Sequence, residues 1–160
     1  MKKRILLIFL CLYSVVTYAA DVDVPSGKVT STVLGNENAG IELTIERLND
    51  SDPTYASVTQ LFFYDAKGEI GLSVGIMKLD GEQGIASFYQ VGGPRSSEVP
   101  SLIKSNLNLN TSYAIKYLSP KNGRIVLDVT GEILALNIGF SISKVEHMVS
   151  GMKLVDVGWY

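Results

Sequence analysis

Hydrophobic and polar residues alternate with a period of two along most of the chain after residue 27. Such alternation is typical of antiparallel strands that have one face in a core and the other in water. Ile41, Leu43 and Ile45, for example, are separated by single polar residues. The pattern predicts nine strands, at residues 28–34, 41–46, 55–64, 69–79, 85–91, 112–118, 124–130, 133–142 and 153–160.

Short turn sequences separate several of these segments. Residues 65–68, 80–84 and 119–123 are rich in aspartate, asparagine and glycine, which tolerate the backbone angles of hairpin turns. Frequent turns between short strands are typical of sandwiches and barrels. The predicted fold class is therefore all-β: an antiparallel β-sandwich of the jelly-roll type.

One segment departs from the alternation. Gly92 to Ser97 form a loop, and a short helix is expected near residues 98–107, with Pro100 in its first turn. Val99, Leu102 and Ile103 would share one face of that helix. The expected fold is thus a sandwich with one short helix.

Residues 1–19 have the composition of a secretory signal peptide. Three basic residues begin the chain, an apolar stretch follows, and Thr17 and Ala19 place small residues before a predicted cleavage at Ala20. The apolar stretch is too short for a membrane span, and the short basic start is typical of bacteria. We therefore expect an exported bacterial protein, periplasmic or secreted, with a single domain over residues 20–160.

Loss of the signal peptide changes the composition. The whole chain has 14 basic and 16 acidic residues, and three of the basic ones lie within residues 1–19, so the net charge moves from −2 to −5. The only cysteine, Cys11, is lost as well, which argues against a disulfide framework and a thiol nucleophile. An acidic balance without a basic cluster argues against nucleic acid as a partner.

Few residues suit catalysis. His147 is the only histidine and has no diagnostic nucleophile beside it, so we expect a partly exposed loop histidine. Glu42 and Glu46 would lie about 13 Å apart on a flat strand, which is too far for a glycosidase pair and predicts a solvated face. Acidic residues near strand ends leave calcium open, although no calcium-loop spacing is present. The sequence predicts no other cofactor and no enzyme.

The predicted strand at 69–79 has small residues, Gly71, Ser73 and Gly75, on one face. Glycine inside a strand indicates that something approaches the backbone closely. The approaching group would be either a ligand in a shallow groove or a large aromatic side chain of a neighbouring strand, such as Phe62 or Tyr89. We expect the aromatic side chain.

Aromatic residues are the candidates for ligand contact. A tyrosine or tryptophan ring offers a sugar an apolar face and a polar edge. The predicted stacking residues are Tyr89, Tyr113, Tyr117 and Trp159. Arg95 lies in a Gly- and Pro-rich loop that a packed core does not require, and such loops often carry binding, so it is the predicted polar anchor.

The C-terminal part contains a characteristic order of motifs. An aromatic segment at 110–117 leads through a Pro-Lys-Asn-Gly turn to residues 123–132, then to Leu-Asn-Ile-Gly at 136–139, and the chain closes on Ser-Gly-Met-Lys-Leu-Val-Asp-Val-Gly-Trp-Tyr. This order, mainly over residues 110–160, resembles laminin G-like domains of the concanavalin A-like jelly-roll group. The resemblance implies two curved antiparallel sheets and a ligand surface on a concave face or at the loop rim. Members bind carbohydrates or proteins, and some are hydrolases.

Taken together, these features predict a non-catalytic exported domain that recognises a glycan or a protein through a sheet face or the loop rim. The alternative is a periplasmic inhibitor or immunity protein that blocks a toxin or a cell-wall enzyme, since its acidic charge would steer it to a basic target. A small outer-membrane β-barrel and a glycosidase are less favoured. The sequence leaves the ligand and the oligomeric state open.

Overall fold

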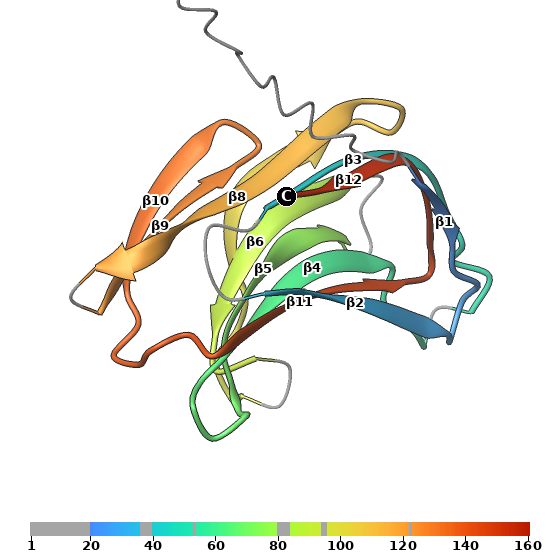
Figure 1. The fold of residues 1–160 in the computed structure, drawn as a ribbon. Coiled ribbons are helices and arrows are strands. Elements are labelled where there is room, and N and C mark those ends of the chain that lie inside the picture. The colour runs from blue at the N-terminus through green and yellow to red at the C-terminus, as the bar shows by residue number, and fades with distance from the viewer. Residues whose placement is uncertain (1–19, 36–39, 53, 80–83, 94–95, 122) are drawn as a thin grey trace, which may run out of the picture.

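The computed structural model describes residues 20–160 except 36–39, 53, 80–83, 94–95 and 122. The predicted signal peptide and Arg95 therefore lie outside the described residues. The described strands form two six-stranded sheets that face each other across one hydrophobic core (Figure 1). This arrangement confirms the predicted all-β antiparallel sandwich.

Both sheets mix strands from distant parts of the chain. Sheet A has the strand order β1-β12-β3-β8-β9-β10, with β1 (Ala20–Asp23), β3 (Gly40–Leu48), β8 (Ser112–Lys121), β9 (Arg124–Val129), β10 (Glu132–Asn137) and β12 (Met152–Trp159). Sheet B has the order β2-β11-β4-β5-β6-β7, with β2 (Val29–Gly35), β4 (Val58–Tyr64), β5 (Ile70–Lys78), β6 (Ile85–Val91), β7 (Ser101–Leu107) and β11 (Lys144–Ser150). The C-terminal strand β12 thus lies between β1 and β3 in sheet A.

Alternate residues of the strands point into the space between the sheets, as the sequence pattern predicts. Ile41, Leu43 and Ile45 of β3 are each at most 1 % exposed. Phe63 of β4 and Tyr117 of β8 meet edge to face, with ring centroids 5.0 Å apart. Because β4 belongs to sheet B and β8 to sheet A, this aromatic pair joins the two layers in the core.

The predicted helix near residues 98–107 is wrong. Ser101–Leu107 form β7, which pairs with β6 at the edge of sheet B, and no helix occurs among the described residues. Val99 and Leu102 are 82 % and 52 % exposed, so the apolar spacing that suggested a helix does not mark a buried face. The open edge of β6 supplies backbone hydrogen bonds to this segment, and this tertiary pairing overrides the local pattern.

Two further strands, β1 and β11, were not predicted. In β11 the inward positions are Val145, His147 and Val149, each at most 2 % exposed. A histidine in the middle of the apolar series hides the alternation from a sequence pattern. The expectation that His147 is a partly exposed loop residue is therefore wrong. The strand expected at 133–142 also ends early, at Asn137.

The predicted turn at 65–68 is confirmed. The Gly68 N–H donates to the Asp65 carbonyl at 3.1 Å, and Gly68 has φ +81°, which favours glycine. The Asp65 carboxylate accepts from the backbone N–H groups of Lys67 and Glu69 at 2.8 and 2.9 Å. The predicted turn at 80–84 lies largely outside the described residues.

The small-residue face of β5 is covered by protein groups. A Cβ atom added at Gly71 would overlap the ring of Phe140, and one added at Gly75 would overlap the Thr59 carbonyl oxygen and the Cβ of Gln60. An aromatic side chain does fill the space at Gly71, but it comes from the segment before β11 and not from Phe62 or Tyr89. The glycines therefore serve packing.

Candidate functional site

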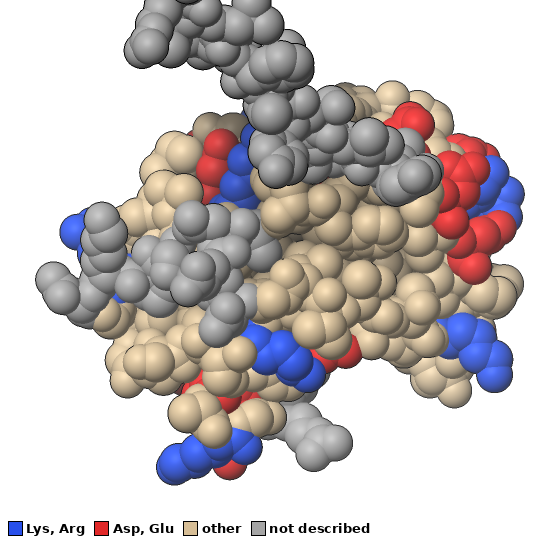
Figure 2. Space-filling view, in the orientation of Figure 1, with Lys and Arg blue, Asp and Glu red and all other residues tan. Residues whose placement is uncertain are grey.

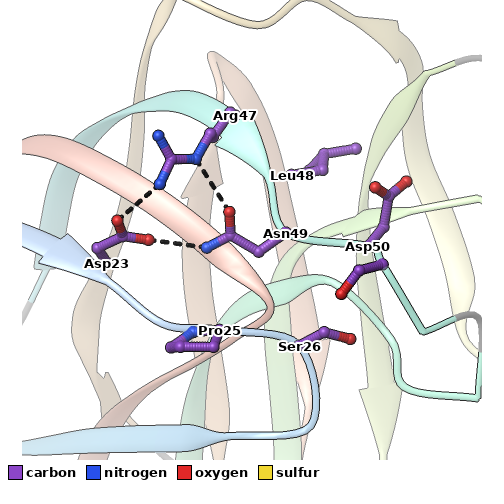
Figure 3. Close-up of a pocket in the computed structure, with 8 residues that line it drawn as sticks. Asp23, Pro25, Ser26, Arg47, Leu48, Asn49 and Asp50 are labelled. Atoms are coloured by element: carbon purple, nitrogen blue, oxygen red, sulfur yellow. Dashed lines mark hydrogen bonds and ion pairs between the residues drawn. The ribbon is translucent and has the colours of Figure 1, made fainter.

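An open pocket lies at the end of the sandwich where the β1–β2 connection passes the loop after β3. We call it the rim pocket. Its volume is about 540 Å³, and it is lined by Asp23, Pro25, Ser26, Arg47, Leu48, Asn49, Asp50 and Ser51 (Figure 3). In Figure 2, acidic and basic side chains gather at the right-hand end of the molecule, where β1 lies in Figure 1. The pocket is therefore a polar hollow at the loop rim.

Strand pairing brings the pocket residues together. β12 lies between β1 and β3, and the register places Asp23 of β1 and Arg47 of β3 opposite the same residue, Lys153. The Asn49 N–H donates to the Gly151 carbonyl at 2.7 Å, which ties the start of the β3–β4 loop to the turn before β12. Residues 23 and 47 become neighbours only because the last strand inserts between their strands.

A hydrogen-bond network joins three of the lining side chains (Figure 3). Arg47 donates from Nη2 to Asp23 Oδ2 at 2.7 Å and from Nε to Asn49 Oδ1 at 3.0 Å. Asn49 donates from Nδ2 to Asp23 Oδ1 at 2.8 Å and to the Val24 carbonyl at 2.9 Å. Because each group restrains the other two, the network holds a carboxylate, a guanidinium and an amide in fixed positions at the pocket wall.

The network remains accessible to water. The side chains of Arg47 and Asp23 are 53 % and 47 % exposed. In Figure 3 the second terminal nitrogen of Arg47 points away from both Asp23 and Asn49. Each carboxylate oxygen can accept more than one hydrogen bond, and a guanidinium carries five N–H donors. The pocket therefore presents donors and acceptors to a polar ligand.

The second acidic side chain of the pocket, Asp50, is paired with a cation. Its carboxylate accepts a hydrogen bond from the Lys78 ammonium, and this bond together with the positive charge lowers the pKa of Asp50 from its usual value. Asp23 is paired with Arg47. Each acidic side chain of the pocket thus has a cationic partner.

An exposed aromatic ring packs against the connection that supplies two of the pocket residues. Tyr55, in the β3–β4 loop, is 51 % exposed, and its ring atoms lie 3.1 Å from the position that a Cβ on Gly27 would take. Gly27 has φ +73° and no side chain, so the ring packs directly against the β1–β2 connection. This connection also supplies Pro25 and Ser26 to the pocket.

The structure places two of the predicted stacking residues in the core. Tyr113 and Tyr117 are 7 % and 2 % exposed. The Tyr113 hydroxyl donates to the Asn108 carbonyl at 2.6 Å and accepts from the Asn108 N–H at 2.8 Å. A sugar cannot lie on either ring without displacing core residues, so we do not include them in the candidate site.

Two other predicted stacking residues, Tyr89 and Trp159, do not line the rim pocket. Tyr89 and Trp159 are partly buried and pack against the core, and Arg95 lies outside the described residues. Trp159 donates from Nε1 to His147 Nδ1 at 3.0 Å. The only sequence feature that could have indicated the pocket is the mainly polar segment Arg-Leu-Asn-Asp-Ser-Asp at residues 47–52. Hydrophobic alternation does not distinguish this segment from an ordinary loop.

A second polar cluster lies on β4 and β11 of sheet B. The Tyr64 hydroxyl donates to Glu146 Oε2 at 2.8 Å, and Lys144 donates to the same oxygen at 3.0 Å while its Nζ lies 3.9 Å from the Tyr64 ring centroid. Hydrogen bonds from Ser31, Lys144 and Tyr64 lower the pKa of Glu146 to about 2. Burial and the Glu146 carboxylate raise the pKa of Tyr64 to about 12. The polar groups of this cluster thus hydrogen-bond to one another, which favours a structural role.

Metal-binding groups do not gather in the part of the chain that the structure describes: no three His, Cys, Asp or Glu side chains there could hold a metal ion together. That same part contains no helix of the length and apolarity needed to cross a membrane.

No protein-family model matches the sequence, and no curated protein matches it. Among solved structures, CG-16, a homodimeric agglutinin from chicken liver, aligns with a TM-score of 0.51 at 9 % identity, over 82 % of this chain and 100 % of that one. A toad ovary galectin in complex with thio-digalactose gives 0.51 at 8 % identity, over 84 % and 100 %. The carbohydrate-binding module CBM66 from Bacillus subtilis gives 0.53 at 12 % identity, over 89 % and 91 %.

At these identities the likeness shows the fold alone. This chain has the jelly-roll type of β-sandwich found in galectins and in CBM66. The expected jelly-roll architecture is confirmed. The structural similarities do not point specifically to laminin G-like domains.

Proposed function

We propose that this chain is a non-catalytic glycan-binding domain and that the rim pocket holds the sugar. The observation that carries the proposal is the preformed network of Asp23, Arg47 and Asn49 in an open pocket. A sugar hydroxyl both donates and accepts, so it can donate to the carboxylate and accept from the guanidinium. Because the side chains are already held in place, binding orders few groups.

The surroundings of the network suit a sugar ring. Pro25 and Leu48 supply apolar surface to the pocket wall, and the exposed ring of Tyr55 packs at Gly27, two residues from Pro25. Carbohydrates present both hydroxyl groups and apolar C–H faces, and an amphipathic ring such as tyrosine can contact the latter. We therefore assign hydrogen bonding to Asp23, Arg47 and Asn49, and stacking to Tyr55.

The state of the pocket acids supports binding without hydrolysis. A glycosidase needs one carboxylic acid whose pKa is raised so that it can protonate the leaving group. The Lys78 ammonium instead lowers the pKa of Asp50, and Asp23 is ion-paired with Arg47. The fold shared with galectins and a carbohydrate-binding module agrees with this function but does not select it alone.

Export is part of the proposal and rests on residues 1–19. The basic start, the apolar stretch and the small residues before Ala20 support a secretory signal peptide. We propose that the mature domain binds its glycan in the periplasm or outside the cell.

A glycan array followed by isothermal titration calorimetry tests the proposal. With the best array ligand, Arg47→Ala and Asn49→Ala should each weaken binding by about tenfold or more, because each substitution leaves polar groups of the bound sugar without partners. Arg47→Lys should also weaken binding, since a lysine ammonium cannot donate to Asp23 and Asn49 with the planar geometry of the guanidinium.

Arg124→Ala is the matched control, because Arg124 is an exposed arginine on β9, far along the sheet from β1. It should leave binding and melting temperature unchanged. If no glycan binds, or if one binds equally well to the Arg47 and Asn49 variants, the proposal fails. Capture of a toxin or a cell-wall enzyme in the absence of any glycan binding would favour the alternative, an exported inhibitor.

A further inference from the structure

The first strand of sheet B has a sequence that is the same in both directions. Residues 29–33 of β2 are Val-Thr-Ser-Thr-Val, and Ser31 is the central residue. β2 pairs with β11 on one side only, and no described strand pairs with its other side. Over residues 29–33 the pairing with β11 is regular. The free edge is thus a straight template of backbone donors and acceptors.

Edge strands normally carry features that prevent pairing with another chain, such as charged residues, prolines and bulges. β1 has Asp21 and Asp23 and an irregular register with β12. β7 has Lys104 and two register shifts, and an ion pair of 3.9 Å between Lys104 and Glu132 links its edge to that of β10.

β2 has none of these features between its two valines. Residues 29–33 contain no charge and no proline. Val29 and Val33 are 65 % and 62 % exposed, although valine side chains on a strand are normally covered. An uncharged, regular edge with exposed valines is a predicted site of strand pairing.

We propose that β2 is a homodimerisation edge, at which two copies of this chain pair antiparallel about a two-fold axis at Ser31. Each Val29 then lies opposite Val33 of the partner subunit, and each Thr30 lies opposite Thr32 of the partner subunit. Sheet B becomes one continuous twelve-stranded sheet, twice the six strands of a single copy. In a two-fold interface the same surface of each copy must fit its own image. The palindromic sequence of residues 29–33 meets this condition, because each residue type faces the same type in the partner subunit.

The pairs formed in this register are favourable. Valine against valine and threonine against threonine are good cross-strand pairs on a pleated surface. Lys28 comes opposite Leu34 of the partner subunit, so no like charges are brought face to face by the strands. The second copy is therefore a better occupant of this edge than a charged segment would be.

The dimer is expected to be weak. β1, the edge of sheet A on the same side, has two aspartates whose like charges would meet at the two-fold axis, so only β2 contributes. An interface one strand wide is smaller than the standard size for stable complexes. We expect a Kd on the order of 10 µM.

Sedimentation equilibrium of the purified chain, from about 1 to about 500 µM, brackets this Kd. The wild type should shift from monomer to dimer. Val29→Lys combined with Val33→Lys places two lysine pairs face to face across the axis and should raise the Kd at least about tenfold. Both positions are exposed, so the fold should persist, which circular dichroism would check.

The charge-complementary variant, Val29→Lys combined with Val33→Glu, gives two Lys–Glu pairs across the same axis and should recover the dimer. Val99→Lys combined with Ile133→Lys adds the same charge at residues that are 82 % and 66 % exposed, one of them on the β10 edge, and should leave the dimer intact.

Three results would overturn the proposal. They are a wild type that remains monomeric throughout the range, a control variant that dissociates like the β2 variant, and a charge-complementary variant that fails to dimerise. Hydrogen exchange at high and low concentration supplies an independent readout, because the β2 amides should gain protection only in the dimer.

Discussion

The buried histidine predicts a steep dependence of stability on pH. His147 is 2 % exposed, accepts a hydrogen bond at Nδ1 from the Trp159 indole N–H at 3.0 Å, and has Thr59 Oγ1 2.8 Å from Nε2. Because an indole nitrogen only donates, Nδ1 must be unprotonated and the neutral ring carries its hydrogen on Nε2. A second proton would put a charge in the core and an N–H against an N–H.

Burial accordingly lowers the pKa of His147 from 6.5 to about 4. The unfolded chain binds a proton between these two values and the folded chain does not, so the free energy of unfolding rises with pH across this window. The contribution is complete above pH 6.5 and is lost as the pH falls to 4. At about 1.4 kcal/mol per pKa unit, the free energy of unfolding should be about 2–3 kcal/mol lower at pH 4.5 than at pH 7.5.

Urea unfolding followed by fluorescence measures this difference, since Trp159 is the only tryptophan and contacts His147 directly. Between pH 7.5 and pH 4.5 the free energy of unfolding of the wild type should fall by about 2–3 kcal/mol more than that of His147→Gln, because the amide has no charged form. Carboxylates that titrate near pH 4.5 contribute to both proteins and cancel in the comparison. Parallel pH dependences of wild type and variant would refute the argument.

Two further predictions concern sheet B. Gly75→Ala should destabilise the protein by about 2–4 kcal/mol in urea unfolding, because the added Cβ overlaps the Thr59 carbonyl oxygen. Gly158→Ala, where no atom lies within 4 Å of the added Cβ, should change stability by less than about 1 kcal/mol, and an equal effect of both would contradict the packing explanation. Tyr64→Phe removes a hydroxyl donor to Glu146, so an NMR titration should find the carboxyl pKa above its wild-type value of about 2; an unchanged pKa would show that the other donors suffice.

Much of the fold was predictable because it follows from local alternation. The strand predicted at residues 85–91 coincides with β6, and the predictions for β2, β3, β4 and β5 differ from the structure by a few residues at their ends. The turn at 65–68 was predictable for the same reason, since Asp65 and Gly68 suit it whatever surrounds them.

The candidate site was less predictable. Residue type alone marked Tyr113 and Tyr117 as stacking residues, but a tyrosine ring suits a core as well as a surface, and both rings are buried. Asp23 and Asn49 look like ordinary loop residues in the sequence. They become one network with Arg47 only when β12 pairs with both β1 and β3.

The sequence by itself determined the all-β class, most strand positions and the hairpin turn at 65–68, because the two-residue period and the turn residues act over a few neighbours. Only the tertiary structure decided that residues 101–107 form a strand, that His147 is buried, and that three side chains from two distant segments form the hydrogen-bond network of the rim pocket. Each of these depends on which strand edge lies beside the segment. That choice is set by pairing between residues far apart in the chain, which no local pattern contains.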